Sequence, residues 1–130
     1  MSETEKEILL RDLCMRLPYG VVMATGYGKG LLTSIRVNDS NEKLGINVDP
    51  VLTRLFNVNE VKPYLFPLSS MTEEQEIEYD ATFETIVYED GSKDSAMTYR
   101  TFDYLNKNKF DYRGLIPKGL AEDATGKNIY

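Results

Sequence analysis

The sequence predicts an α+β domain: an antiparallel sheet of four or five strands, with an N-terminal helix and a C-terminal helical pair packed on one face. Two observations lead to this fold class. Runs rich in β-branched and aromatic residues alternate with turn residues at 19–48 and 82–88. Segments with apolar residues at helical spacing flank them, at 2–17 and 99–120. A chain of 130 residues has the length of one domain. We expect that domain to span residues 1–122, with a loose tail at 123–130.

The N-terminal helix is predicted by a capping box, in which Ser2 caps the first turn and Glu5 reaches back to it. The helix should run to about Arg16 and end at Pro18, because proline cannot continue it. The spacing predicts the following buried face: Leu10, Leu13, Cys14 and Leu17.

A three-stranded meander is predicted next. Strands at 19–25 and 31–37 should form a hairpin around the glycine-rich turn 26–30, and a second turn at 38–43 should lead into a strand at 44–48. Residues 49–68 are ambiguous. Asp49 and Pro50 favour a short helical turn before a strand at 57–61, whereas 51–58 also has strand character. Pro63 and Pro67 predict that 64–68 is an edge or a loop rather than a central strand.

The second half of the chain should add an acidic helix, a strand and two further helices. Residues 70–73 cap a helix that reaches about residue 79, and 82–88 form a strand with a turn at Asp90 and Gly91. Apolar spacing predicts a helix from residue 99. Asp111 should then open a second short helix, which Pro117 ends near Ile116.

Several blocks of sequence resemble a family of small uncharacterised proteins encoded in Bacteroidales genomes and their phages or mobile elements. The blocks are Tyr-Leu-Asn at 104–106, Phe-Asp-Tyr-Arg-Gly-Leu-Ile at 110–116 and Lys-Gly-Leu-Ala at 118–121. Residues 12–21, 61–65 and 67–74 are similar to the same family. The resemblance implies no functional residues, since the family has no activity known to us. Residues 106–109 lack the histidines associated with that position, and Pro117 replaces an expected charged residue.

Composition removes several chemistries. The chain has no histidine and one cysteine, Cys14. Without an imidazole there can be no Ser-His-Asp triad, no Cys-His pair and no histidine metal ligand. We therefore assign no catalytic residue, no metal and no cofactor, and we expect Cys14 to be a small buried residue.

Acidic charge is concentrated in one segment. Residues 1–71 carry eight acidic and eight basic side chains, whereas residues 73–94 carry nine acids and a single base, Lys93. This field repels phosphate backbones, so we expect no direct nucleic-acid binding, and it can attract a basic protein surface. The apolar runs are too short to span a membrane, and the acidic N-terminus is unlike a secretory signal, so we expect a cytoplasmic protein.

Two motifs that suggest ligands have simpler explanations. The run Gly-Tyr-Gly-Lys-Gly at 26–30 lacks the Ser or Thr of a phosphate-binding loop and lies between strands, so we interpret it as a hairpin turn. Consecutive carboxylates on one helix point in different directions and are interpreted as a solvated face rather than a Mg²⁺ site. They are Glu73, Glu74, Glu76, Glu78 and Asp80.

The sequence favours a non-enzymatic protein-binding module of a phage or mobile element. Nine tyrosines supply contact area with a polar tip, and the candidate partner-binding residues are Tyr99, Tyr112 and Arg113. For Arg113 we favour a structural pairing with an acid such as Asp103 or Glu122. The alternative is a nucleotide-binding module or a carboxylate-based metal-dependent hydrolase, in which Arg113, Lys62 or Lys29 would meet a tyrosine in a deep pocket. Homodimerisation through a sheet edge stays open.

Overall fold

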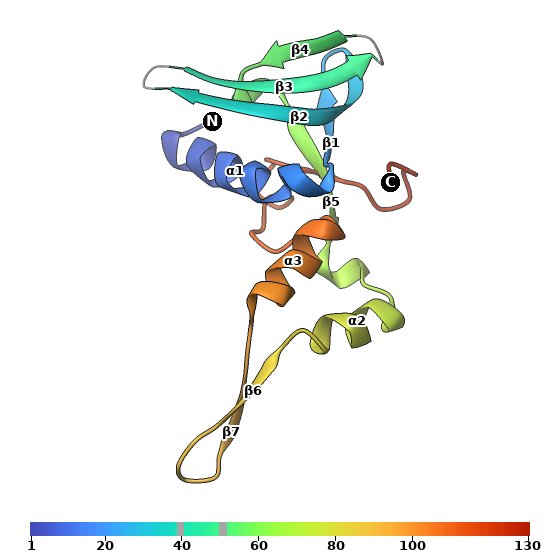
Figure 1. The fold of residues 1–130 in the computed structure, drawn as a ribbon. Helices are drawn as coiled ribbons and strands as arrows, with labels where there is room; N and C mark the ends of the chain where they lie inside the picture. The colour runs from blue at the N-terminus through green and yellow to red at the C-terminus, as the bar shows by residue number, and fades with distance from the viewer. Residues whose placement is uncertain (39–40, 50–51) are drawn as a thin grey trace.

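The computed structural model describes residues 1–38, 41–49 and 52–130 and is shown in Figure 1. Its α-helices are α1 (Glu3–Arg16), α2 (Glu73–Asp80) and α3 (Tyr99–Lys107). Short 3-10 helices lie at Leu17–Tyr19, Val58–Glu60 and Leu68–Ser70. The strands are β1 (Val22–Thr25), β2 (Gly28–Asn38), β3 (Asn41–Asp49), β4 (Leu52–Phe56), β5 (Lys62–Pro67), β6 (Glu84–Val87), β7 (Lys93–Ala96), β8 (Phe110–Asp111) and β9 (Glu122–Asp123).

The main sheet has seven strands in the order β4-β3-β2-β1-β5-β8, with β9 also pairing with β5. The first five of these strands are antiparallel neighbours, whereas β8 and β9 run parallel to β5. The α+β class and the N-terminal helix are confirmed. The prediction of a purely antiparallel sheet of four or five strands was too simple, because two-residue strands carry too little sequence to be recognised.

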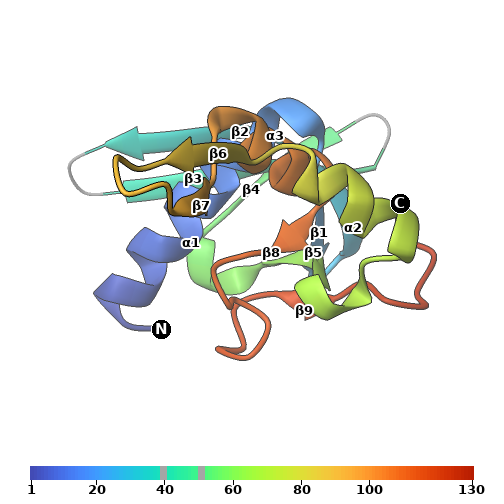
Figure 2. The same ribbon diagram turned by 90° about the horizontal axis from the view of Figure 1, so that it is seen from below.

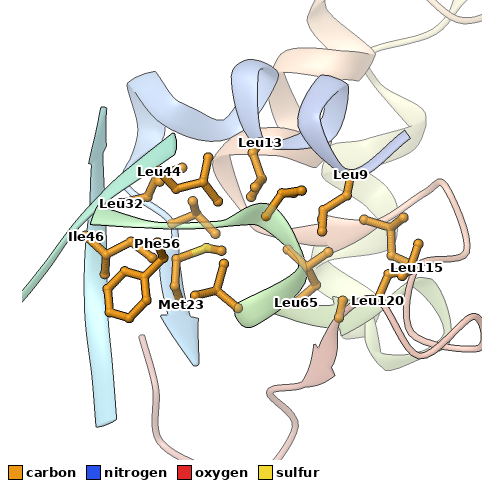
Figure 3. Packing of buried hydrophobic residues seen from close by; sticks show 14 residues of the cluster. Leu9, Leu13, Met23, Leu32, Leu44, Ile46, Phe56, Leu65, Leu115 and Leu120 are labelled. Carbon is orange, nitrogen blue, oxygen red and sulfur yellow. The ribbon is translucent and has the colours of Figure 1, made fainter. Parts of the chain in front are cut away.

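Helix α1 lies against the sheet, and Figure 3 shows Leu9 and Leu13 pointing into a core built from every long strand. Ser2 accepts the backbone N–H of Glu5 while the Glu5 side chain accepts that of Ser2, so the predicted capping box is present. The predicted buried face was wrong by one residue position. Cys14 is exposed. The fully buried residues of the helix are Leu9, Asp12, Leu13 and Arg16.

The predicted meander is confirmed, with a tighter first turn than expected. Thr25 pairs with Gly28, so the hairpin turn is Gly26-Tyr27. Gly30 of β2 lies close to the backbone of β3, because a Cβ there would be 2.7 Å from Cγ2 of Ile46 and 2.8 Å from the Asn47 carbonyl oxygen. Part of the predicted second turn, at 39–40, lies outside the described residues.

The interpretation of residues 49–68 was wrong in order. The strand β4 comes first and the helical turn Val58–Glu60 follows it; residues 50–51 of the predicted early turn lie outside the described residues. β5 is not an edge, since it pairs with β1, β8 and β9. The Leu65 carbonyl and the Phe66 N–H, which belong to one peptide unit and point in opposite directions, bond to Ala124 on one side and to Lys109 on the other. Its prolines are tolerated because Pro63 lies where pairing with β1 stops and Pro67 is the last residue of the strand.

The second C-terminal helix does not form. Phe110 and Asp111 pair instead with Phe66 and Pro67 as β8, and the chain turns through Gly114 at φ +69° and Gly119 at φ +74°. These left-handed conformations are incompatible with a helix. Residues 123–130, for which a loose tail is predicted, begin in β9 and end at Tyr130. The Tyr130 hydroxyl accepts the Val22 N–H and donates to the Tyr64 carbonyl, at 2.8 and 2.9 Å.

Candidate functional site

A projecting arm is the most distinctive feature of the surface. Helix α2 and the hairpin β6–β7, residues 73–96, extend away from the main sheet in Figure 1, and they face the viewer when the molecule is seen from below in Figure 2. We call this segment the acidic arm. The arm contains all nine acids of the segment identified from the sequence, together with Lys93. The acidic arm thus carries nine of the 21 acidic side chains of the protein against a single basic one.

Short-range hydrogen bonds fix the loop of the hairpin in the arm. Gly91 at φ +85° donates its N–H to the Tyr88 carbonyl, and Tyr88 donates its N–H to the Ser92 carbonyl at 2.9 Å. This is a three-residue loop with glycine in the left-handed position. Ser92 also donates its backbone N–H and its hydroxyl to Asp90, and these bonds lower the pKa of the Asp90 carboxyl. The predicted strand at 82–88 and its Asp-Gly turn are therefore confirmed, with the strand restricted to Glu84–Val87.

Two layers of contacts fix the base of the arm to α3. The Thr98 hydroxyl donates to the Thr82 carbonyl at 2.8 Å, and the Thr82 hydroxyl meets that of Thr101 at 2.9 Å. The Tyr104 hydroxyl lies 3.2 Å from both the Gln75 carbonyl and a Glu78 carboxylate oxygen. Burial, then the neighbouring Glu78, raises the pKa of Tyr104 to about 12. The arm therefore leaves the body at a defined direction.

Apolar side chains on the arm are open to solvent. Every residue of β6 is exposed, including 39% of Ile86 and 63% of Val87, and Tyr88 follows at 49%. On α2, Ile77 is 67% exposed. Exposed aliphatic and aromatic groups surrounded by charges are typical of protein-binding surfaces.

A buried charged cluster joins α1 to the C-terminal segment. Arg16, fully buried, donates to both carboxylate oxygens of Asp12 at 2.8 and 3.1 Å and to the Phe110 carbonyl at 2.7 Å. Arg113 donates to Asp12 at 2.8 Å and to the Tyr112 hydroxyl at 2.8 Å. The two guanidinium groups lie 5.3 and 4.5 Å from the centre of the Tyr112 ring. One buried carboxylate thus organises two arginines around an aromatic ring.

The three predicted partner-binding residues fall into two places. Tyr112 and Arg113 belong to this partly buried cluster, where Arg113 keeps 25% of its side chain exposed. The structural pairing favoured for Arg113 is present, although the acid is Asp12. Tyr99, 77% exposed, begins α3 next to the end of the arm. Sequence reasoning missed Asp12 and Arg16, although their four-residue spacing beside Leu9 and Leu13 marks one helical face.

Asp111 stabilises a turn rather than a helix. Its two carboxylate oxygens accept the backbone N–H groups of Leu115 and Ile116, each at 2.9 Å, while Phe110 and Asp111 remain paired to β5. Asp111 is 7% exposed, and its carboxylate satisfies one buried and one partly buried backbone donor. Its role is structural.

Lys109 connects the same region to the end of α1. It has φ +61°, and its ammonium group donates to the carbonyls of Tyr19 and Lys107 at 2.9 and 2.7 Å. Burial, then the nearby Arg16, lowers the pKa of Lys109. The lysine borders a cavity of about 350 Å³ together with Phe110 and Tyr130.

A groove of about 650 Å³ lies along the outer side of α1. Its apolar floor includes Leu10, Cys14, Met15 and Val37. Its rim carries charges of both signs: Glu3, Lys6, Glu7, Arg11, Glu42 and Arg113. Most of these pair with one another or with Asp12, so the groove presents no excess of either charge.

Two kinds of feature are absent from the described residues. Among residues 1–38, 41–49 and 52–130, no three Asp, Glu or Cys side chains lie close enough together to hold a metal ion. No helix in that part of the chain combines the length and the apolar character needed to cross a membrane.

Comparison with known proteins adds no assignment. No family model matches the sequence, and no curated protein and no solved structure matches it.

Proposed function

We propose that this chain is a non-enzymatic protein-binding module whose acidic arm engages a basic protein partner. The supporting observation is the arm itself, an element fixed at its base that presents exposed aliphatic side chains among nine carboxylates. Charge of one sign steers an oppositely charged partner and rejects nucleic acid, while exposed apolar groups supply the area to bury. The resemblance to small proteins of Bacteroidales phages and mobile elements agrees with an accessory, cytoplasmic role.

The geometry gives less support to the alternative, a nucleotide-binding or metal-dependent module. Arg113 does meet a tyrosine beside a groove, as that alternative requires. However, Asp12 already pairs with Arg113, and the other charged side chains of the groove rim pair with one another, so the groove offers no excess of positive charge to a phosphate. A thermal shift with nucleotides or with Mg²⁺, lost in Arg113→Ala, would favour this alternative over the arm.

The test compares two charge reversals of equal size. Glu84→Lys with Glu89→Lys changes the arm, and Glu3→Lys with Glu7→Lys makes the same change of net charge on α1. A partner captured by the wild-type protein would be purified and its Kd measured for all three proteins. We expect at least tenfold weaker binding for the arm variant, binding close to wild type for the α1 variant, and a loss of affinity in about 0.5 M salt.

Either of two outcomes would contradict the proposal. One is that no protein binds the wild-type chain above background. The other is that both reversals change the Kd equally, because the partner would then respond to net charge and not to the arm.

A further inference from the structure

The hairpin β6–β7 has two strands, and within the described residues each strand pairs only with the other. Tyr88 donates to Ser92, and antiparallel ladders alternate between bonded and non-bonded pairs. The pairs Ile86–Asp94 and Glu84–Ala96 therefore face inward. Thr85 and Val87 direct their backbone N–H and C=O groups outward from β6, where a further strand can pair with them.

The two edges of the hairpin differ in how they are protected. The β7 edge carries Lys93, and a charged lysine on an edge strand discourages pairing with another chain. The β6 edge has no lysine or proline, and its Thr85, Ile86 and Val87 are all β-branched residues that favour strands. An isolated two-stranded hairpin is marginally stable in water, so a third strand would stabilise it. The free edge of β6 is therefore the better acceptor.

The charge of the surroundings selects the occupant. A second copy of this chain would bring another set of nine acids to the edge and would be repelled. Along the hairpin, Glu84 and Ile86 share one face with their cross-strand partners Ala96 and Asp94. Thr85 and Val87 lie on the opposite face. An incoming strand with a basic side chain beside Glu84 and an aliphatic side chain beside Val87 matches both faces of β6.

We propose that β6 accepts a basic, extended segment of a partner protein as a third strand of the hairpin. The proposal rests on the proposed function, because it specifies how the acidic arm binds. Backbone hydrogen bonds from Thr85 and Val87 supply the affinity, and the alternating side chains supply the selectivity.

The experiment uses the full chain and a synthetic octapeptide of alternating lysine and valine. Binding is measured by calorimetry, and the contacted residues are mapped from backbone amide NMR signals. A second peptide of the same sequence, N-methylated at every backbone nitrogen, keeps the charges but cannot donate backbone hydrogen bonds. Val87→Pro removes an outward donor of β6, and Ser95→Pro removes an outward donor of β7, one that donates to the Asp94 side chain at 2.8 Å.

We expect the octapeptide to bind the wild-type chain and Ser95→Pro with similar Kd values and to shift the β6 signals. Binding should be at least tenfold weaker for the N-methylated peptide and for Val87→Pro. Should Val87→Pro disturb the hairpin itself, seen as loss of the Ser92 amide signal, the peptide comparison alone decides.

Three results would overturn the proposal. If N-methylation leaves the Kd unchanged while Glu84→Lys weakens it, the arm binds by charge alone, and the proposed function stands without this mechanism. Failure of the octapeptide to bind would also reject the mechanism. Dimerisation of the wild-type chain in ultracentrifugation, abolished by Val87→Pro, would show that the occupant is a second copy.

Discussion

Substitution of Asp12 by Asn is expected to be strongly destabilising. The change keeps the size of the side chain but removes the negative charge that pairs with two arginines. Both Asp12 and Arg16 have fully buried side chains, and Arg16 loses its charged partner together with one of the two acceptor oxygens, which lie at 2.8 and 3.1 Å. Arg113 loses the negative charge of the same partner. Removing one member of a buried ion pair costs about 3–5 kcal/mol, because the other charge stays buried without compensation.

This loss is large compared with the whole stability of a domain, which is about 5–15 kcal/mol. For a chain of 130 residues, 1 kcal/mol corresponds to roughly 4 °C in Tm, so Asp12→Asn should melt more than about 10 °C below wild type. The assay is urea unfolding followed by circular dichroism, with thermal melts as a second measure.

Helix α1 also provides the control. Glu7 pairs with Arg11 at the same four-residue spacing and at 3.0 Å, but these side chains are 64% and 75% exposed. Glu7→Gln should cost about 0.5 kcal/mol or less, because solvent screens an exposed pair. If the two substitutions destabilise the protein within about 0.5 kcal/mol of each other, the burial argument for the cluster is refuted.

Three further predictions concern turns and close contacts. Hydrogen bonds from Ser92 lower the pKa of Asp90, so the stabilisation that they give is complete above the ordinary pKa of 3.8 and is lost as the pH falls through the lowered pKa. The Ser92 amide NMR signal should follow this titration, and Asp90→Asn should abolish the pH dependence of that signal. Lys109→Ala should be about 1 kcal/mol less stable than Lys109→Gly in urea, since φ is +61° and only glycine adopts it without strain; equal stabilities would contradict this. Gly30→Ala should lower the free energy of unfolding by about 1–3 kcal/mol, because the added Cβ would meet the β3 backbone. Gly26→Ala should change it by under about 0.5 kcal/mol, because a Cβ at Gly26 meets no other atom.

Features with local causes were predicted from the sequence. The Ser2 cap needs only Glu5. The cap of α2 was predicted within residues 70–73, and the structure forms it with Thr72 and Gln75. The hairpin loop of the arm follows from Asp90 and Gly91, whose bonds join neighbours within a few residues. Such interactions are the same in any tertiary context, so the pattern alone identifies them.

Features with distant causes were predicted wrongly. α1 turns Asp12 and Arg16 inward, because Arg16 finds carbonyl acceptors about ninety residues later, at Leu105 and Phe110. The prediction assumed that the most apolar face of the helix is buried, and it therefore placed the face containing Cys14 in the core. Asp111 caps its turn as expected, yet pairing with β5 takes the place of the helix it was expected to open.

The sequence by itself determined the α+β class, the caps, the meander and the concentration of acid in residues 73–94, since each depends on residue type and short spacing. Only the tertiary structure decided that this acid lies on a projecting arm and that Arg113 closes a buried cluster with Asp12. It also decided that β5 is central despite its prolines. The physical reason is that these features depend on which distant segments pack together. Where two segments pack, the backbone polar groups and buried charges of both must find partners.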